Sequence, residues 1–403
     1  MTEQNIIESM EYVDYKPPID IDLNYIGKTI PISLYNENIK TCPHYSNLII
    51  NGKITLKKNS DGSIMANIDT EKINFVNILH EFSEMRYYIG GNEVDSVANP
   101  GISVAMKGLT SFEDDKLYND AGWRVTSNAN NNILNEKGYF SICIPLKIIF
   151  GFCEDYTNYI YRIHQELQIM RSTNGNCNNT LVMDKDVAKD YTVSLSLSEI
   201  IWRIPQYKFS LELEQKINNE ILTDTEYEMF YRHWMYLSKS YITGKTFTWD
   251  IPTSYYKPRY VILGFQKNRD DKITTDNGNF DLCNLENVQV TLNNNIRYPN
   301  NRLNVNVSEN KCTQIYNMYK EFKRSYYGQE GKPLVDYYDF INKYPIVVID
   351  CSKQSEIIKG STINIKIEFQ WWDSFSIDSV IHCLVITSDR ARYNPLKNMV
   401  VVH

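Results

Sequence analysis

The sequence predicts an all-β protein built from two β-sandwich domains. Apolar segments of strand length recur along the 403 residues and are separated by turns rich in Asn, Gly and Asp. The 30 tyrosines suit pleated surfaces, and the abundant asparagines suit turns. The strand pattern also occurs twice, with a period of about 200 residues, which indicates a duplicated domain.

Each half of the chain carries its own series of expected strands. In the first half they are NLIINGKITLKK, SEMRYYIGGNEVD, YFSICIPLKIIF, RIHQELQIM and YTVSLSLSEIIWRI. In the second half they are YEMFYRHWMYL, RYVILGFQ, ENVQVTLNNNIRY, YPIVVID, INIKIEF and SVIHCLVIT. Short strands at this spacing favour antiparallel sandwiches over βαβ units.

The two series share landmarks in the same order. The matched positions are Gly91 with Asn294, Pro145 with Pro345, Ile163 with Ile363, and Pro205 with Pro395. The common order predicts an N-terminal segment at 1–24, for which an extended conformation is one option. It further predicts a first β-domain at 25–207 and a second at 208–403.

Helical periodicity is clear in one segment. Between Lys311 and Tyr326, apolar residues recur at helical spacing, and Gly328 ends the pattern. We therefore expect an inserted helix at 311–327. Weaker patterns at 209–221 and 334–343 predict a linker helix within 208–222 and a short helix before the YPIVVID strand.

The stretch YPIVVIDCSKQ at 344–354 resembles the end of a strand that carries a catalytic nucleophile. A phosphatase of the Asp-x-Asp type needs a second acid at Ser352, and a cysteine phosphatase loop needs Arg where Ile357 stands. A nucleophile elbow needs flanking glycines, which neither Cys351 nor Ser352 has. We therefore predict a structural strand end with Cys351 buried.

Other candidate sites for chemistry are also incomplete. The GKT at 244–246 lacks the earlier glycine of a phosphate-binding loop, and the six histidines form no HxH, HxxH or HExxH pair. Paired acids such as Asp114-Asp115 fit solvated loops, although the separation in space on which carboxylate catalysis depends cannot be seen in a sequence. We expect no enzyme activity and no catalytic, cofactor-binding or metal-binding residues.

Charge and hydropathy restrict the partners. The net charge is −7, no Lys/Arg run is present, and the N-terminal segment is acidic, which argues against sequence-specific binding of nucleic acid. Eight cysteines are scattered without a CxxC, as expected of reduced thiols. No signal pattern and no apolar stretch of 18 residues occurs. A soluble protein of the cell interior is expected.

Longer blocks of the sequence are more specific. GGNEVDSVANPGISVAMKGLTSF and AGW are followed by FSICIPLKIIFGFCEDY, IIWRIPQYK and KPRYVILGFQKNR. FDLCNLENVQVTLNNNIRYPNNRLNVNV, YNMYKEFKRSYYG, PIVVIDCSKQ and YNPL complete the series. In this order, over residues 75–398, they resemble the double jelly-roll major capsid proteins of Polinton/Maverick and adintovirus-like elements, which are related to adenovirus hexon.

This resemblance implies two eight-stranded jelly rolls in one chain, without catalytic residues or a cofactor. It implies homotrimers of hexagonal outline, assembled inside the host cell into an icosahedral shell and located in the virion. Neighbouring capsomers and penton or minor capsid proteins would be partners, and an inner membrane is a further option for the acidic N-terminus.

The resemblance also suggests trimer contacts at the inserted helix 311–327, matched in the first half by the less regular 101–123. The candidate interface residues are Tyr316, Tyr319, Lys320, Lys323, Arg324, Trp371 and Trp372. Adjacent residues on a strand face opposite ways, so one of the two tryptophans could point outward to a partner, although the residues favour one ring in the core and the other under a loop. A jelly-roll attachment protein that stacks a tryptophan on sugar rings remains an alternative, and an enzyme derived from a jelly roll is a third.

Overall fold

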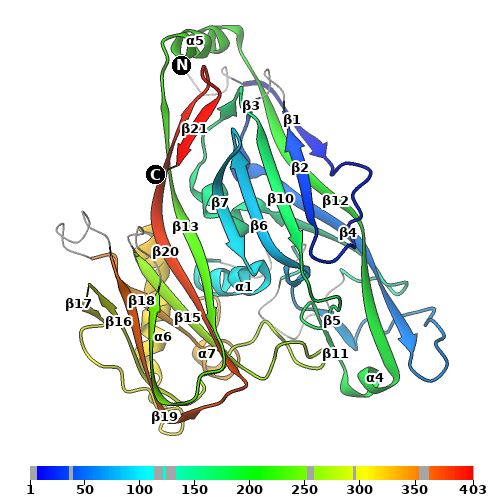
Figure 1. Ribbon diagram of the computed structural model, residues 1–403, viewed down its shortest axis with the longest axis vertical. Coiled ribbons are helices and arrows are strands. Elements are labelled where there is room, and N and C mark those ends of the chain that lie inside the picture. Colours follow the sequence, from blue (N-terminus) through cyan, green and yellow to red (C-terminus); the bar gives the residue numbers. More distant parts are fainter. Residues whose placement is uncertain are drawn as a thin grey trace.

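The fold is known from a computed structural model, which describes residues 7–35, 40–112, 121–123, 133–251, 258–293, 296–353 and 363–402. Two β-sandwiches lie side by side, each formed by two antiparallel sheets, with helices at their loops (Figure 1). The predicted all-β class and double jelly-roll architecture are confirmed. No helix in the described part of the chain is long and apolar enough to cross a membrane.

The first sandwich contains the strands of the N-terminal half. One sheet has the order β8 (Tyr139–Pro145), β4 (Asn47–Lys58), β12 (Tyr191–Phe209), β3 (Lys40–Thr41) and β9 (Ile160–Tyr161), and β1 (Ile7–Tyr15) also pairs with β12. The facing sheet has the order β2 (Thr29–Leu34), β10 (Gln165–Arg171), β6 (Phe82–Ile89) and β7 (Asn92–Ala98). A separate two-stranded ribbon joins β5 (Ile73–Phe75) to β11 (Leu181–Met183).

The second sandwich contains the strands of the C-terminal half. One sheet has the order β13 (Tyr227–Lys239), β20 (Ser379–Asn394), β15 (Tyr260–Lys267) and β18 (Ile346–Asp350), and β21 (Met399–Val402) also pairs with β20. The facing sheet has the order β14 (Gly244–Ile251), β19 (Ile365–Phe375), β16 (Leu285–Leu292) and β17 (Ile296–Tyr298).

The two sandwiches have the same topology. Strands β8, β4, β12 and β1 correspond in order to β18, β15, β20 and β13, and β2, β10, β6 and β7 correspond to β14, β19, β16 and β17. The hairpins β6–β7 and β16–β17 occupy equivalent places in the two sandwiches, and Gly91 lies at the turn of the first, whereas its predicted match Asn294 lies outside the described residues. Strands β10 and β19 begin 200 residues apart, at Gln165 and Ile365.

One predicted strand match needs correction. The segment YFSICIPLKIIF is a strand only as far as Pro145, and it continues as the short helices α2 (Leu146–Ile149) and α3 (Gly151–Asp155). Strand β18, in contrast, begins after Pro345. A short apolar run reads the same in a buried strand and in a buried helix turn, so periodicity could not separate the two.

The longer helices lie close to the predicted segments, with one exception. Helix α5 (Leu211–Leu222) links the sandwiches, α6 (Thr313–Tyr327) and α7 (Tyr337–Asn342) precede β18, and α4 (Lys185–Asp190) is short. Helix α6 ends at Gly328, whose left-handed backbone (φ 70°) closes the last turn. Helix α1 (Pro100–Ser111) had no helical pattern because all twelve of its residues are buried. The described residues also include the turns η2 (Pro43–Tyr45) and η3 (Ile78–Glu81).

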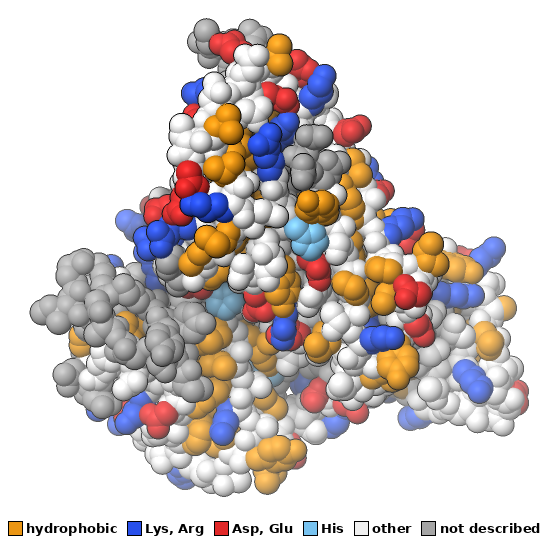
Figure 2. Space-filling view, turned by 45° about the horizontal axis from the view of Figure 1, so that its top comes forward, with side chains coloured by type: hydrophobic (Ala, Val, Ile, Leu, Met, Phe, Trp, Pro, Cys, Tyr) orange, Lys and Arg blue, Asp and Glu red, His pale blue; other side chains and the backbone are white. Residues whose placement is uncertain are grey.

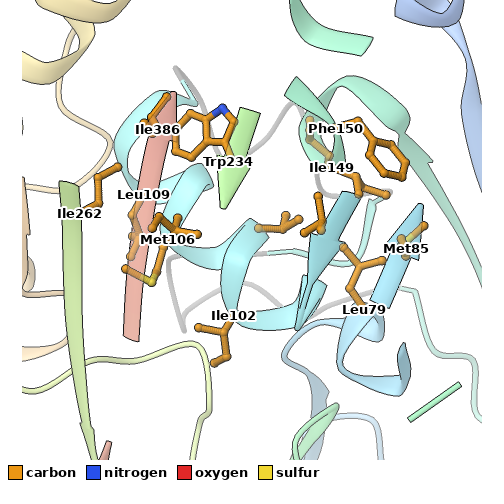
Figure 3. Close-up of a cluster of buried hydrophobic side chains, with 14 of the residues drawn as sticks. Leu79, Met85, Ile102, Met106, Leu109, Ile149, Phe150, Trp234, Ile262 and Ile386 are labelled. Carbon is orange, nitrogen blue, oxygen red and sulfur yellow. The ribbon is translucent and has the colours of Figure 1, made fainter. Parts of the chain in front are cut away.

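Helix α1 lies where the two sandwiches meet (Figure 3). Met106 and Leu109 point toward Ile262 and Ile386 of the second sandwich, while Leu79 and Met85 of the first lie on the other side of the helix (Figure 3). All of these side chains belong to one contiguous buried cluster that includes both sandwich cores. The core therefore runs through the junction without interruption.

Candidate assembly surface

The strand end that resembled a catalytic site holds its thiol away from solvent. Cys351 is fully buried, as predicted, and burial raises the pKa of its thiol far above the usual range, so the reactive thiolate is disfavoured. The Asp350 carboxylate accepts hydrogen bonds from Ser325 Oγ and from the Ser352 backbone N–H, both at 2.8 Å. Among the described residues, no cluster of His, Cys, Asp and Glu could hold a metal ion.

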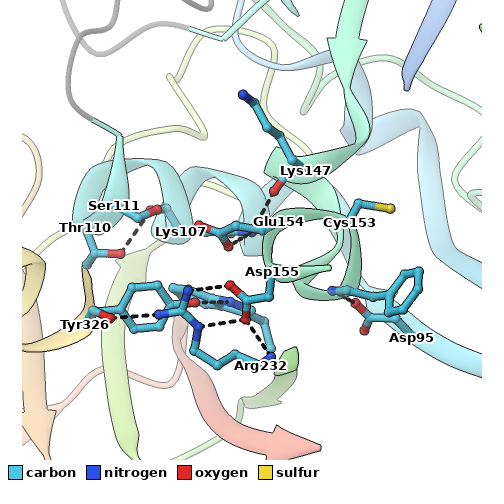
Figure 4. A network of polar contacts seen from close by, with 12 residues as sticks. Asp95, Lys107, Thr110, Ser111, Lys147, Cys153, Glu154, Asp155, Arg232 and Tyr326 are labelled. Carbon is cyan, nitrogen blue, oxygen red and sulfur yellow. Dashed lines mark hydrogen bonds and ion pairs between the residues drawn. The ribbon is translucent and has the colours of Figure 1, made fainter. Parts of the chain in front are cut away.

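A network of polar contacts fixes the two sandwiches to each other (Figure 4). Arg232 on β13 donates from Nε and from its backbone N–H to Asp155 Oδ2 of α3, both at 2.8 Å. Its Nη2 donates to the other carboxylate oxygen, Asp155 Oδ1. Its Nη1 donates to the Tyr326 carbonyl at 2.8 Å, and the guanidinium lies 3.5 Å from the centre of the Tyr326 ring. One arginine thereby joins β13, α3 and α6.

A largely buried pair of a histidine and an aspartate supports the same junction. His233 Nδ1 lies 2.7 Å from Asp95 Oδ1 on β7, and the other oxygen of Asp95 accepts the backbone N–H of Phe152. Burial lowers the pKa of His233, but the hydrogen bond and charge of Asp95 outweigh it and leave the pKa raised. The imidazolium is therefore stabilised by a carboxylate from the other sandwich.

The backbones also approach closely at the junction. A Cβ added to Gly151, at the start of α3, would lie 1.7 Å from the carbonyl oxygen of Arg232, so only glycine fits there. Nearby, Tyr231 donates its hydroxyl to the Val94 carbonyl at 2.8 Å, and its ring packs edge-on against Phe152 at 5.3 Å. The sandwiches are thus locked in one relative position.

Three of the candidate interface side chains, Tyr319, Lys323 and Trp371, are buried inside the single chain. The Tyr319 hydroxyl accepts the backbone N–H groups of Leu334 and Val335, and Lys323 Nζ donates to the carbonyls of Phe112 and Lys332. Trp371 is 1% exposed and stacks on Phe369. Helical spacing placed Tyr319 and Lys323 on one helix but could not show that neighbouring loops cover them.

The other four candidates reach the surface. Lys320 and Arg324 are exposed on α6, and Tyr316 is half-buried beneath Lys320 Nζ, which lies 5.1 Å from the centre of its ring. Trp372 is 42% exposed and donates Nε1 to the Val305 carbonyl at 2.7 Å. Trp371 thus packs in the core, whereas Trp372 lies partly exposed, and the polar atom of its side chain is already bonded to the loop at Val305.

A cavity of about 560 Å³ lies between α6 and β18, beside Arg324. Its apolar lining includes Pro299, Met318, Phe322 and Ile349. Strand β18 is the last strand of its sheet among the described residues, so the backbone edge that faces away from β15 has no strand partner there.

Strand β1 presents exposed side chains at the surface, and the sequence did not predict this strand. It pairs along its length with β12, from Ile7 opposite Phe209 to Tyr15 opposite Trp202, yet Met10 and Tyr12 are 50% and 41% exposed. Over the face shown in Figure 2, basic and acidic side chains are interspersed rather than segregated. The signal in the sequence was the alternation in IESMEYVDY, which is short and interrupted by acids.

Comparisons with known proteins agree with this architecture. A family model described as "Double jelly roll-like domain" matches residues 70–391. A search of curated protein sequences found no match. Among solved structures, the chain is similar to a Sputnik virophage structure determined by cryo-EM (TM-score 0.60, 9% identity, covering 99% of this chain and 89% of that one).

Two further structures are similar over nearly their whole length. One is the capsid of the virus PBCV-1 (TM-score 0.58, 10% identity, 98% of this chain and 96% of that one), and the other is the major capsid protein of mavirus (TM-score 0.54, 10% identity, 100% and 93%). Identities this low show the fold. The family model, which covers most of the chain, establishes that this protein belongs to the double jelly roll-like domain family.

Proposed function

We propose that this protein is the major capsid protein of an icosahedral virus and is located in the virion shell. The observation that carries the proposal is the rigid pairing of two jelly rolls of equal topology in one chain. Three such chains present six similar domains, and a trimer of this kind has a nearly hexagonal outline that can tile a flat face. The similar PBCV-1 and mavirus structures are named as a virus capsid and a major capsid protein, which supports the proposal.

The protein's surface also fits a structural role. Two ion pairs at the junction, Arg232 with Asp155 and His233 with Asp95, join the two sandwiches into one building block. Symmetric association commonly uses aromatic residues of the kind exposed here on β1 and β19 (Tyr12 and Trp372).

Purification of the full chain, followed by mass measurement in solution and negative-stain electron microscopy, tests the proposal. We expect a trimer and, in images, particles with threefold symmetry and a hexagonal outline. A chain that remains monomeric at concentrations of about 100 μM, well above the dissociation constant of a stable capsid interface, would contradict it.

A further inference from the structure

The junction inside the chain shows how one sandwich receives another. The receiving side of the first sandwich is formed by β7 and α3, and the strand that docks there is β13, the edge strand of the second sandwich. Figure 1 shows β13 lying beside β7 in the middle of the molecule. The contact is therefore heterologous, because the edge strand β13 of the second sandwich meets different elements, β7 and α3, of the first.

The elements equivalent to β13 and to β7 lie at the two ends of the molecule. By topology, β1 of the first sandwich corresponds to β13, and β17 of the second corresponds to β7. Helices α1 and α6 are likewise inserted at the same place, after β7 and after β17. In Figure 1, β1 lies at one side of the molecule, and β17, β18 and α6 lie at the opposite side. Each chain thus presents one docking strand and one receiving side.

The two docking strands share a sequence feature but differ in burial. Strand β13 contains Met229-Phe230-Tyr231, in which Met229 is 0% and Tyr231 is 3% exposed, and Tyr231 bonds to the first sandwich. Strand β1 contains Met10-Glu11-Tyr12, and its Met and Tyr are half-exposed. The Met and Tyr that the junction buries on β13 are half-exposed on β1, where the guanidinium of Arg203 lies 5.5 Å from the centre of the Tyr12 ring.

The cavity beside α6 combines apolar side chains with two basic groups that complement an acid on β1. It offers the apolar Pro299, Met318 and Ile349 next to the open edge of β18, with Arg324 and Lys353 on its lining. Strand β1 carries three acids, of which Glu8 and Asp14 already pair with Lys208 and Arg203 of β12 at 2.8 and 3.8 Å, which leaves Glu11 as the acid outside these pairs. Two acids also line the cavity, Glu321 and Asp350, and Asp350 already accepts two hydrogen bonds within the chain.

We propose that β1 of one copy docks against α6 and the open edge of β18 of a neighbouring copy. The contact is head-to-tail, so each chain uses its strand on one side and its cavity on the other, and three copies close a ring. In the proposed contact, the docking strand β1 contributes acid to the basic groups of the cavity. In the internal junction, the docking strand β13 contributes the basic side chains Arg232 and His233. This reversal keeps β1 from competing for the internal site. The inference rests on the proposed capsid function.

Two full-length variants separate the two sides of the contact. Met10→Lys with Tyr12→Lys alters exposed side chains of β1 only, and Arg324→Glu with Lys353→Glu alters the cavity only. We expect each to need at least about tenfold more protein to form trimers, as for loss of a central contact. Ile64→Lys, at a site that is 68% exposed on the first sandwich, is the matched control and should leave the trimer unchanged. Melting temperatures within about 2 °C of the parent show that all variants fold.

Mixing the two defective variants gives the decisive result. The cavity variant retains an intact β1 and the strand variant retains an intact cavity, so an equimolar mixture should form a heterodimer that cannot close into a trimer. Absence of that heterodimer, or trimers of normal affinity in either variant, overturns the inference while leaving the capsid proposal intact. A parent chain that never forms trimers instead defeats the capsid proposal itself.

Discussion

At the scale of single residues, Arg232 is the side chain that unites three elements of the junction. Its partner Asp155 has a side chain only 15% exposed, so removing the cation leaves a carboxylate that water solvates poorly. The sequence placed Arg232 on a strand but gave no sign of this role, because Asp155 is 77 residues away and belongs to the other sandwich.

We predict that Arg232→Met lowers the free energy of unfolding by about 3 kcal/mol, because it strands the charge of Asp155. Urea denaturation at fixed protein concentration measures the loss. Arg390→Met on β20 is the control, since Arg390 and Glu228 form an exposed pair at 3.6 Å with half-exposed side chains. That substitution should cost under about 0.5 kcal/mol. Equal losses in both variants would contradict the assigned role.

Two other histidines, one from each sandwich, give the molecule a dependence on pH. Burial lowers the pKa of His80 to about 4, and burial together with the charge of nearby His80 lowers that of His382 to about 3. Both line the same cavity of about 430 Å³, and His80 Nε2 has no hydrogen-bond partner. Both rings are therefore held neutral at neutral pH.

Acid should weaken the fold through these two residues. Their folded pKa values lie below the ordinary value of 6.5, so the unfolded chain binds more protons below that pH. The stability they contribute is present above pH 6.5 and is lost as the pH falls, by up to about 1.4 kcal/mol per pH unit for each histidine. His233 has a raised pKa, so its contribution is full below pH 6.5 and is lost only as the pH rises.

Thermal unfolding between pH 6.5 and about 5 tests this prediction, because most carboxylates stay ionised in that range. The melting temperature of the parent should fall as the pH is lowered. In His80→Gln, one of the two protons is no longer taken up on unfolding, so the fall should be about half as steep. The same slope in parent and variant would count against it.

At the scale of elements, the structure depends on how closely helix α3 approaches strand β13. Gly151 begins α3 at the one place where a side chain would meet the backbone of β13. Backbone cannot rotate away as a side chain can, so the two elements would have to separate. The sequence showed a glycine after an apolar run but could not show what lies opposite.

We predict that Gly151→Ala destabilises the protein by about 3 kcal/mol, as expected for overpacking against backbone. Gly175→Ala is the matched control, because its added Cβ would meet only the end of the exposed Ile26 side chain. The control should stay within about 0.5 kcal/mol of the parent. Chemical denaturation of both variants measures the difference, and a tolerated alanine at position 151 would show that the junction is looser than described.

How well each helix or strand could be predicted from the sequence depended on how its residues are buried. Helices α5 and α6 and the β6–β7 and β16–β17 hairpins lie where periodicity and turn residues placed them, since each has a covered and a solvated side or a tight turn. Helix α1 was indicated only by the resemblance, which matched 101–123 to the inserted helix, because burial on every side removes the polar face that makes helical periodicity visible in a sequence. Strand β1 escaped because its acids break the alternation.

At the scale of the whole molecule, the two sandwiches act as one body with two different ends. A continuous core crosses the junction through α1, and ion pairs from both sandwiches meet there. The molecule therefore presents a docking strand and a receiving cavity at fixed positions, which is the arrangement that a closed ring requires. The trimer and mixing experiments above belong to this scale.

The sequence by itself determined the fold class, the duplication and the burial of Cys351. These follow from local periodicity, from repeated order along the chain and from missing motif partners, all of which a single sequence contains. The candidate interface was only partly predictable: Lys320, Arg324 and Trp372 are exposed, whereas Tyr319, Lys323 and Trp371 are buried. Only the tertiary structure distinguished the exposed candidates from the buried ones. A local pattern shows on which side of a helix or strand a residue lies, but not which distant segment covers that side.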